Sequence, residues 1–147
     1  TVALSDGLRG SDDRAVVVFS EKGRDYRGRN PHRKTIARYH IDGGAICDDT
    51  KRRCDFACEI PATAPATTSL YLIELKGKDL IHACEQILDT MQHLATDLSG
   101  KTVHGRIVLS RVPAPDLRST SYMRCDQALR KRGGTLKQQA KILEENL

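Results

Sequence analysis

The sequence predicts a mixed α/β (α+β) fold in which an antiparallel hairpin, a central strand, a helix and a parallel strand follow one another. Three observations predict it. Residues 54–60 (CDFACEI) alternate in polarity, residues 70–76 (LYLIELK) are almost continuously apolar, and residues 80–98 repeat apolar side chains every three or four positions. A strand–helix–strand unit implies a right-handed parallel crossover, so the preceding hairpin makes the sheet mixed.

The N-terminal part gives weaker signals than the centre. We expect residues 1–147 to form a single domain with its core at about 36–112. Residues 1–14 are polar and predict a loose or short helical lead, whereas residues 15–19 (AVVVF) fit either a strand or a buried helical turn. Residues 20–35 carry two Gly, one Pro and many charges, which predicts a loop.

The hairpin is predicted from two β-rich runs around a polar turn. Residues 36–47 (IARYHIDGGAIC) favour a strand with a bulge at Gly43-Gly44, and residues 48–53 (DDTKRR) favour a turn. In the second strand the alternation places Cys54, Phe56, Cys58 and Ile60 on an apolar face and Asp55, Ala57 and Glu59 on a face that bears carboxylates.

The central strand, its helix and the next strand complete the predicted core. Residues 61–69 read as a connecting loop, and the apolar run 70–76 is typical of a strand buried on both faces. Asp79 is placed to cap a helix over 80–98, and Gly100 stands where that helix would stop. Residues 103–112 predict the parallel strand.

The C-terminal extension, 113–147, is less determined. A helix is predicted over about 121–131, ended by Gly133-Gly134. The last segment (TLKQQAKILEENL) fits either a helix or an edge strand, and its pattern does not choose between them.

Charge indicates a polyanionic partner. The net charge is +5, and clustered cations neutralise phosphates and release counterions. The residues expected to contact nucleic acid are Arg27, Arg29, Arg33, Lys34, Arg52 and Arg53. No apolar run reaches the length of a membrane span and no signal pattern is visible, so we expect a cytoplasmic protein. Five cysteines without a C-x-x-C pair do not predict a zinc site or a disulfide framework, and they read as small buried residues.

Two acids and a lysine carry the predicted chemistry. Asp55 stands on the hairpin, and Glu74 and Lys76 lie two apart on the central strand, so their side chains share one face. Carboxylates suit Mg²⁺ or Mn²⁺, and such an ion polarises a phosphoryl oxygen and activates a bound water. A lysine beside the ion orients that water or stabilises developing charge.

This arrangement resembles the PD-(D/E)xK, or restriction-endonuclease-like, nuclease superfamily. The resemblance rests on Asp55 in CDFACEI, on Glu74-Leu75-Lys76 in LYLIELKGKD and on Gln86 in HACEQIL, and it covers about 36–112. It implies that Asp55, Glu74 and the Leu75 carbonyl hold the metal, that Lys76 assists the attacking water, and that Gln86 faces the site. Cys54 stands where the family motif has Pro.

Several alternatives stay open at single residues. A further acidic ligand could come from Glu21, Asp13 or Asp42, although Asp42 before two glycines also fits turn chemistry. Gln86 fits a solvent-facing helix position as well as a site position. His82 and His93 fit solvated histidines better than phosphate ligands, and Glu59 fits either a supporting acid or a surface charge.

The resulting functional prediction is a small Mg²⁺- or Mn²⁺-dependent nuclease that acts on DNA. The alternatives keep the fold without the chemistry: a nucleic-acid-binding or regulatory protein with a degenerate site, or an immunity-type factor whose basic surface meets an acidic protein. Because no recognition segment is visible beyond the core, a homodimer or a larger protein partner would fit.

Overall fold

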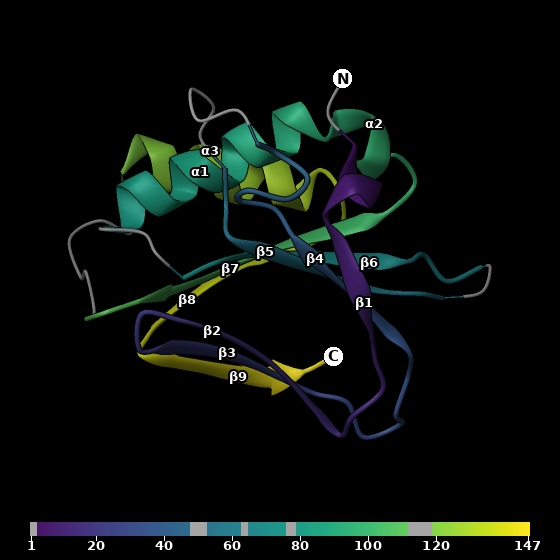
Figure 1. Cartoon of the computed structure of the whole chain (residues 1–147). Helices are drawn as coiled ribbons and strands as arrows, with labels where there is room; N and C mark the ends of the chain where they lie inside the picture. Colours follow the sequence, from purple (N-terminus) through teal and green to yellow (C-terminus); the bar gives the residue numbers. More distant parts are fainter. Residues whose placement is uncertain (1–2, 48–52, 63–64, 76–78, 112–118) are drawn as a thin grey trace.

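The molecule, described here from a computed structural model, is built in layers (Figure 1). A six-stranded sheet carries helices on one face and a three-stranded sheet on the other. The structure describes residues 3–47, 53–62, 65–75, 79–111 and 119–147. The elements are η1 (Leu4–Gly7), β1 (Leu8–Asp12), β2 (Val16–Glu21), β3 (Arg24–Arg29), β4 (Ile36–His40), β5 (Phe56–Ile60), β6 (Ser69–Glu74), α1 (Leu80–His93), α2 (Ala95–Leu98), β7 (Thr102–Leu109), α3 (Thr120–Arg130), β8 (Leu136–Ala140) and β9 (Ile142–Asn146).

The large sheet has the strand order β1-β4-β5-β6-β7-β8. Pairing is antiparallel from β1 to β6, whereas β6 pairs with β7 in parallel and β7 with β8 in parallel. The predicted hairpin is β4–β5, the predicted central strand is β6, and α1 makes the predicted crossover from β6 to β7. The mixed α/β prediction is therefore confirmed at the level of the sheet and its helices.

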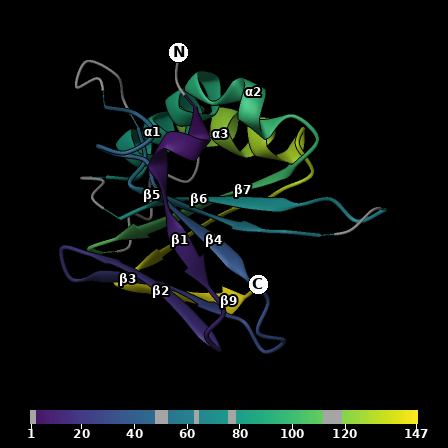
Figure 2. The same ribbon diagram turned by 45° about the vertical axis from the view of Figure 1, so that its right-hand side comes forward.

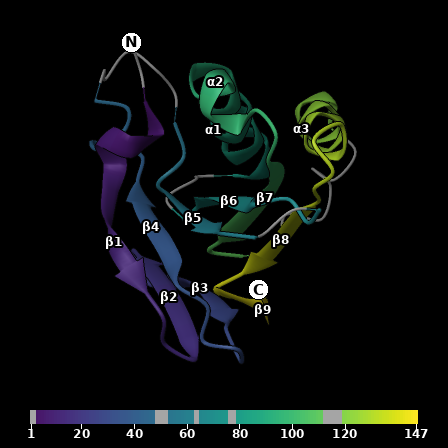
Figure 3. The same cartoon turned by 90° about the vertical axis from the view of Figure 1, so that its right-hand side faces the viewer.

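Helices α1 and α3 lie side by side on one face of this sheet (Figure 3). The predicted cap of α1 is present, because a carboxylate oxygen of Asp79 accepts a hydrogen bond from the His82 amide at 2.7 Å. Ser119 caps α3 in the same way through the Tyr122 amide at 3.1 Å. Among the described residues, no helix is long and apolar enough to span a membrane.

The helix predicted over 80–98 is in fact two helices. Regular α-helix ends at His93, Leu94 adopts φ −103° and ψ 16°, and α2 follows. Leu94 and Leu98 are both buried. Leu94 and Leu98 are four residues apart, a spacing that fits one continuous helix as well as two helices. The hydrophobic pattern therefore could not reveal the break at Leu94.

The two faces of the large sheet cover separate cores. The core under the helices includes Leu70 and Leu72 of β6, and the core under the small sheet includes Tyr71, Ile73 and Leu75. Both faces of the central strand are therefore buried, as predicted. Of the five cysteines, Cys47 is exposed and the other four are buried.

The predicted alternation in residues 54–60 is wrong at its first residue. Cys58 and Ile60 join the core under the small sheet, but Cys54 and Ala57 join the core under the helices. The cause is local: the Asp55 amide donates to the Ile73 carbonyl at 3.1 Å, one residue out of the register that pairs Phe56 with Ile73. Such a bulge-like shift moves the preceding side chain to the other face.

The first strand of the hairpin is shorter than predicted. It ends at His40, and residues 41–46 form a compact turn that the Gly44 amide closes on the Ile41 carbonyl at 3.2 Å. A Cβ atom at Gly44 would overlap the His40 carbonyl oxygen, so this chain reversal needs glycine there. The two glycines thus mark the end of the strand, not a bulge within it.

The loop predicted over 20–35 is wrong for half of its length, which lies in strands β2 and β3. Strand β2 starts in the AVVVF run and pairs with β3, and Lys22 and Gly23 form the turn between them. The third strand of this sheet is β9, which pairs with β3 in parallel. Charged residues dominate β3, so its strand character depends on partners that local composition does not reveal.

The two ends of the chain are also strands. Residues 8–12, predicted as part of a loose lead, form β1 at the edge of the large sheet after the short helix η1. The undecided last segment forms β8 and β9. These two strands belong to different sheets, and Lys141 alone separates them.

Candidate active site

Two buried acidic residues lie at the edge of the large sheet where β5 begins and β6 ends. Asp55 is 2% exposed and Glu74 is fully buried. The Asp55 carboxylate accepts a hydrogen bond from the amide of Leu75, the residue after Glu74, at 2.6 Å. A side-chain oxygen therefore replaces the backbone carbonyl that would continue the sheet, which fixes the Asp55 carboxylate beside the end of β6.

The pKa of the neighbouring Cys54 thiol is affected by both acidic residues. The pKa of Cys54 is raised well above its usual range, chiefly by burial and next by the charge of Glu74, with a smaller effect of Asp55. Burial and nearby anions both disfavour a thiolate, so Cys54 stays neutral. The structure thus brings the Asp55 carboxylate to the residue that follows Glu74.

Helix α1 is attached to the same place by a polar link. The Cys54 amide donates to the Thr90 hydroxyl at 2.8 Å, and that hydroxyl donates to the Gln86 carbonyl at 2.7 Å. The turn of α1 that carries Gln86 therefore lies beside the start of β5. The Gln86 side-chain oxygen is buried and accepts no hydrogen bond from the described residues. This is not the solvent-facing position of the alternative reading, and it leaves an acceptor available near the site.

The Leu75 carbonyl has a partner that the sequence did not suggest. Arg24, the first residue of β3, donates to it from Nη1 at 2.5 Å. Sequence reasoning misses Arg24 because the composition of residues 20–35 favours a loop. The Lys22-Gly23 pair between two runs of charged and apolar residues was the available signal, since X-Gly turns join hairpin strands.

Two predicted site residues, Lys76 and Arg52, lie outside the described residues. Asp42 lies beside Asp55, because its amide donates to the Asp55 carbonyl at 3.3 Å, and its carboxylate binds Arg53 Nε at 2.8 Å. Of the acids considered as further ligands, Asp42 is therefore close to the pair.

The other candidates lie in surroundings that suggest ordinary roles. Glu59 binds Lys101 Nζ at 2.6 Å at the far end of β5. His82 lies in the first turn of α1, and His93 is the last residue of that helix. Asp13 is exposed after β1, and Glu21 ends β2 opposite Arg24.

Most of the cations predicted to contact nucleic acid have acidic or carbonyl partners. Arg27 binds Asp25 at 2.8 Å, and Arg29 binds Glu144 at 3.0 Å. Arg33 donates to the Asp13 carbonyl at 3.1 Å. Lys34 is exposed at the start of the segment that leads into β4. The structure thus spreads Arg27, Arg29, Arg33 and Lys34 along β3 and the segment after it, whereas Arg53 lies beside the carboxylates through its bond to Asp42.

The carboxylate pair fits a divalent cation in part. Among the described residues, no group of three or more His, Cys, Asp or Glu side chains could hold a metal ion. Mg²⁺, however, usually takes one or two carboxylates and keeps several waters. Asp55 and Glu74 are both buried at the end of β6, and their carboxylate oxygens are the hard ligands that Mg²⁺ and Mn²⁺ prefer. Asp55 and Glu74 therefore match Mg²⁺ or Mn²⁺ better than a metal that needs a closed protein cage.

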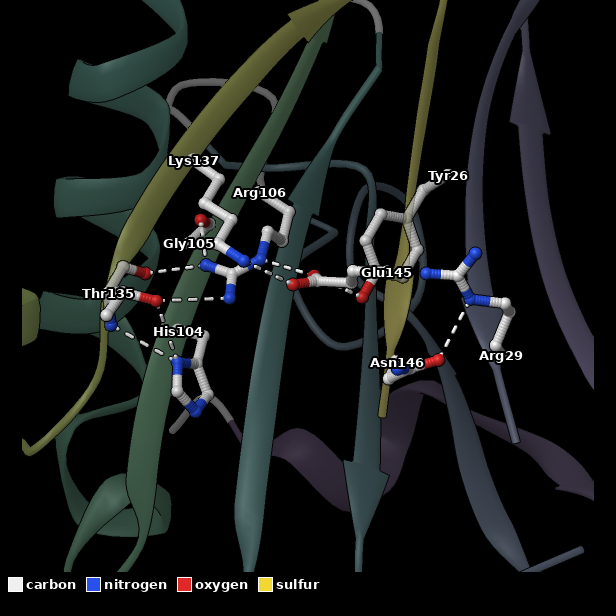
Figure 4. Close-up of polar contacts among 9 residues, drawn as sticks. All are labelled: Tyr26, Arg29, His104, Gly105, Arg106, Thr135, Lys137, Glu145 and Asn146. Atoms are coloured by element: carbon white, nitrogen blue, oxygen red, sulfur yellow. Dashed lines mark hydrogen bonds and ion pairs between the residues drawn. The ribbon is translucent and has the colours of Figure 1, made fainter. Parts of the chain in front are cut away.

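A second polar cluster joins the two sheets away from this site (Figure 4). Arg106 of β7 is 2% exposed and binds the Glu145 carboxylate of β9 at 2.5 Å. The hydroxyl of Tyr26 donates to the same carboxylate at 2.7 Å, and Lys137 donates to its other oxygen at 3.2 Å. Arg106 also donates to the Thr135 carbonyl at 2.7 Å. Arg106 and Lys137 share the one Glu145 carboxylate, so the cluster holds β9 against β7 and β8.

A cavity also lies among the helices, away from the carboxylates. It measures about 500 Å³ and is lined by α1, α2 and the end of α3, at Leu88, Met91, Gln92, Ala95, Ala128, Lys131 and Arg132. None of these residues belongs to the predicted site. The chemistry of the carboxylates, and not the size of this groove, therefore identifies the candidate active site.

Comparison with known proteins gives no further assignment. No family model matches the chain, and neither the curated proteins nor the solved structures include a significant match.

Proposed function

We propose that the chain is a metal-dependent nuclease of the PD-(D/E)xK type that hydrolyses phosphodiesters in DNA. The observation that carries the proposal is the pair of buried carboxylates, Asp55 and Glu74, at the end of the central strand. The element order also supports it, because β4–β5–β6–α1–β7 follows the order of hairpin, central strand, crossover helix and parallel strand that the resemblance implies. The net charge of +5 favours a polyanionic substrate.

Each residue has a defined part in this proposal. Asp55 and Glu74 would hold Mg²⁺ or Mn²⁺, and the bound ion would polarise the scissile phosphate and activate a water. The Leu75 amide orients the Asp55 carboxylate. The Leu75 carbonyl accepts from Arg24 and retains a second lone pair, so it can still face a cation. Lys76 would follow on the same strand and orient the attacking water.

The cleavage test uses supercoiled plasmid and a single-stranded oligonucleotide with Mg²⁺, Mn²⁺ or EDTA. We expect metal-dependent cutting by the wild type and a loss of about a hundredfold or more in Asp55→Ala and Lys76→Ala, because each removes several kcal/mol of transition-state stabilisation. Glu59→Ala is the matched control, since Glu59 is a carboxylate at the other end of β5 that binds Lys101. Cutting that survives both site substitutions would reject the assignment.

A second function is favoured by one contact. Because Arg24 already holds the Leu75 carbonyl, a degenerate nuclease fold that binds nucleic acid without cutting it, or meets an acidic protein partner, is the alternative. A folded wild type that binds DNA but cuts neither substrate with either metal would support this alternative over the nuclease.

A further inference from the structure

The edge of the fold that holds the carboxylates also gathers cations from distant parts of the chain. Strands β6, β7 and β8 run in parallel and end at this edge, and the turns between β2 and β3 and between β8 and β9 lie there too (Figures 1 and 2). The cations at these positions are Lys22, Arg24, Arg111 and Lys141. Only Arg24 was part of the site described above, through its bond to the Leu75 carbonyl.

Lys141 projects from the junction of the two sheets. Its amide donates to the Leu109 carbonyl of β7 at 2.7 Å, and its carbonyl accepts from the Asp25 amide of β3 at 2.9 Å. The backbone is thus held from both sides while the side chain is exposed. Arg24 precedes Asp25 directly, so Lys141 lies close to the arginine that contacts the end of β6.

Both turn lysines occupy a backbone conformation that disfavours them. Lys22 has φ 50° and Lys141 has φ 64°, in the left-handed region that Gly, Asn and Asp adopt more readily. Strained backbone at non-glycine residues is concentrated at functional sites. A lysine at each turn therefore suggests a use for the side chain.

The charges of these two turns are little compensated. The Lys22, Lys141 and Arg111 side chains are exposed, and no hydrogen bond or ion pair joins them to the described residues. The acids nearby are Glu21, which lies opposite Arg24, and Asp25, whose carboxylate binds Ser20 and Arg27 at 2.8 Å each. This contrasts with Arg27 and Arg29, whose charges are matched by acids.

We propose that Lys22, Arg24 and Lys141 form the surface that binds the sugar–phosphate backbone of DNA and leads it to the Asp55–Glu74 site. This rests on the proposed function for its substrate. Exposed lysines held on an anchored backbone suit sequence-independent phosphate contacts, each of which adds to the salt dependence of binding. The surface differs from the one predicted from the basic sequence clusters.

The binding test measures fluorescence anisotropy of a labelled duplex in EDTA, where cleavage does not interfere, over a range of salt concentrations. We expect Lys22→Glu combined with Lys141→Glu to weaken binding about tenfold or more and to lower the salt slope by about two. The matched control is Arg124→Glu combined with Lys131→Glu, which changes the charge equally at exposed positions of α3 and its C-cap, on the helical side of the large sheet. An equal loss in both double variants, or no DNA binding by the wild type, overturns the proposal.

Substitution by glycine separates binding from folding. Lys22→Gly and Lys141→Gly relieve the left-handed strain, so thermal stability should stay the same or rise while DNA binding weakens. A loss of stability together with binding would mean that the lysines are structural. If the binding results hold and the wild type still shows no metal-dependent cleavage, the surface stands and the nuclease proposal fails.

Discussion

The Asp55 side chain accepts the hydrogen bond that a backbone carbonyl would accept in a regular sheet. Its carboxylate binds the Leu75 amide at 2.6 Å, and its own amide turns to the Ile73 carbonyl. The negative charge is therefore positioned by the sheet and does not depend on a flexible rotamer. A carboxylate fixed in this way is suited to bind a cation without reorganisation.

Thr90 should be important for the stability of the fold around Cys54. Its hydroxyl is the acceptor for the buried Cys54 amide. We predict that Thr90→Val costs about 1–3 kcal/mol in the free energy of unfolding, because that amide loses its partner. Urea denaturation measures the loss, and Thr96→Val, at an exposed position of α2, should change stability by less than about 0.5 kcal/mol. Equal effects of the two substitutions would contradict this role.

His104 should make the protein sensitive to acid. Burial lowers its pKa from 6.5 to about 4, and the charge of Arg106 adds to the effect. Since the unfolded histidine takes up its proton at higher pH, stability should fall as pH drops from 6.5 towards 4. His104→Gln should flatten this part of the dependence of the unfolding free energy on pH. An unchanged slope in the variant would show that another group is responsible.

The sequence could identify Asp55 and Glu74, but not what surrounds them. Each acid stands in an otherwise largely apolar run, and such an exception can be seen in the sequence alone. Arg24 is 51 positions from Leu75, and nothing in the spacing links them. The side to which Cys54 points was also hidden, because a shift of one residue in the hydrogen bonding leaves the alternation of residue types unchanged.

Among the elements, β9 depends on one buried ion pair. Glu145 has a lowered pKa: burial raises it, but hydrogen bonds from Arg106 and Tyr26 and the charge of Arg106 outweigh burial. We predict that Glu145→Gln costs about 3–5 kcal/mol, because Arg106 would remain buried without a matching charge. The neighbouring Glu144→Gln removes an exposed ion pair to Arg29 and should cost at most about 1 kcal/mol. Similar midpoints of urea unfolding for both variants would contradict the role of the Arg106–Glu145 pair in holding β9.

The connection into β8 requires glycine. A Cβ atom at Gly134 would overlap the Val103 carbonyl oxygen, which is backbone and cannot move away cheaply. We predict that Gly134→Ala lowers stability by about 1–3 kcal/mol or more, as overpacking does. At Gly133, where φ is +78°, a Cβ atom would make only ordinary van der Waals contacts with Thr102, so Gly133→Ala should cost only about 1 kcal/mol of backbone strain. Thermal melts of the two variants measure this difference, and an equal loss of stability in both would contradict the prediction.

Elements in the centre were predictable and those in the small sheet were not. The core from β4 to β7 pairs mainly with its sequence neighbours, so periodicity and turn signals suffice. Strand β3 obtains a partner from the C-terminal end of the chain, where β9 follows β8 after a single residue. Local patterns carry no information on such long-range pairing, and the charged sequence of β3 favoured the wrong prediction.

At the scale of the whole molecule, the two sheets position different groups. The large sheet positions the carboxylates, and the small sheet brings Arg24 and the turn lysines to the same edge. Since the Arg106–Glu145 pair holds the small sheet in place, weakening it should reduce DNA binding as well as stability. The fold thus joins a candidate metal site to a candidate phosphate surface through contacts between distant segments.

The measurement that tests the central claim most directly is Mn²⁺ binding to the intact chain, followed by electron paramagnetic resonance. We predict Mn²⁺ binding that weakens about tenfold or more in Asp55→Asn and in Glu74→Gln, because each substitution removes a charged ligand while keeping the shape of the side chain. Glu59→Gln should bind like the wild type. Binding that is the same in all four proteins, or absent from the folded wild type, would contradict a metal site at the Asp55–Glu74 pair.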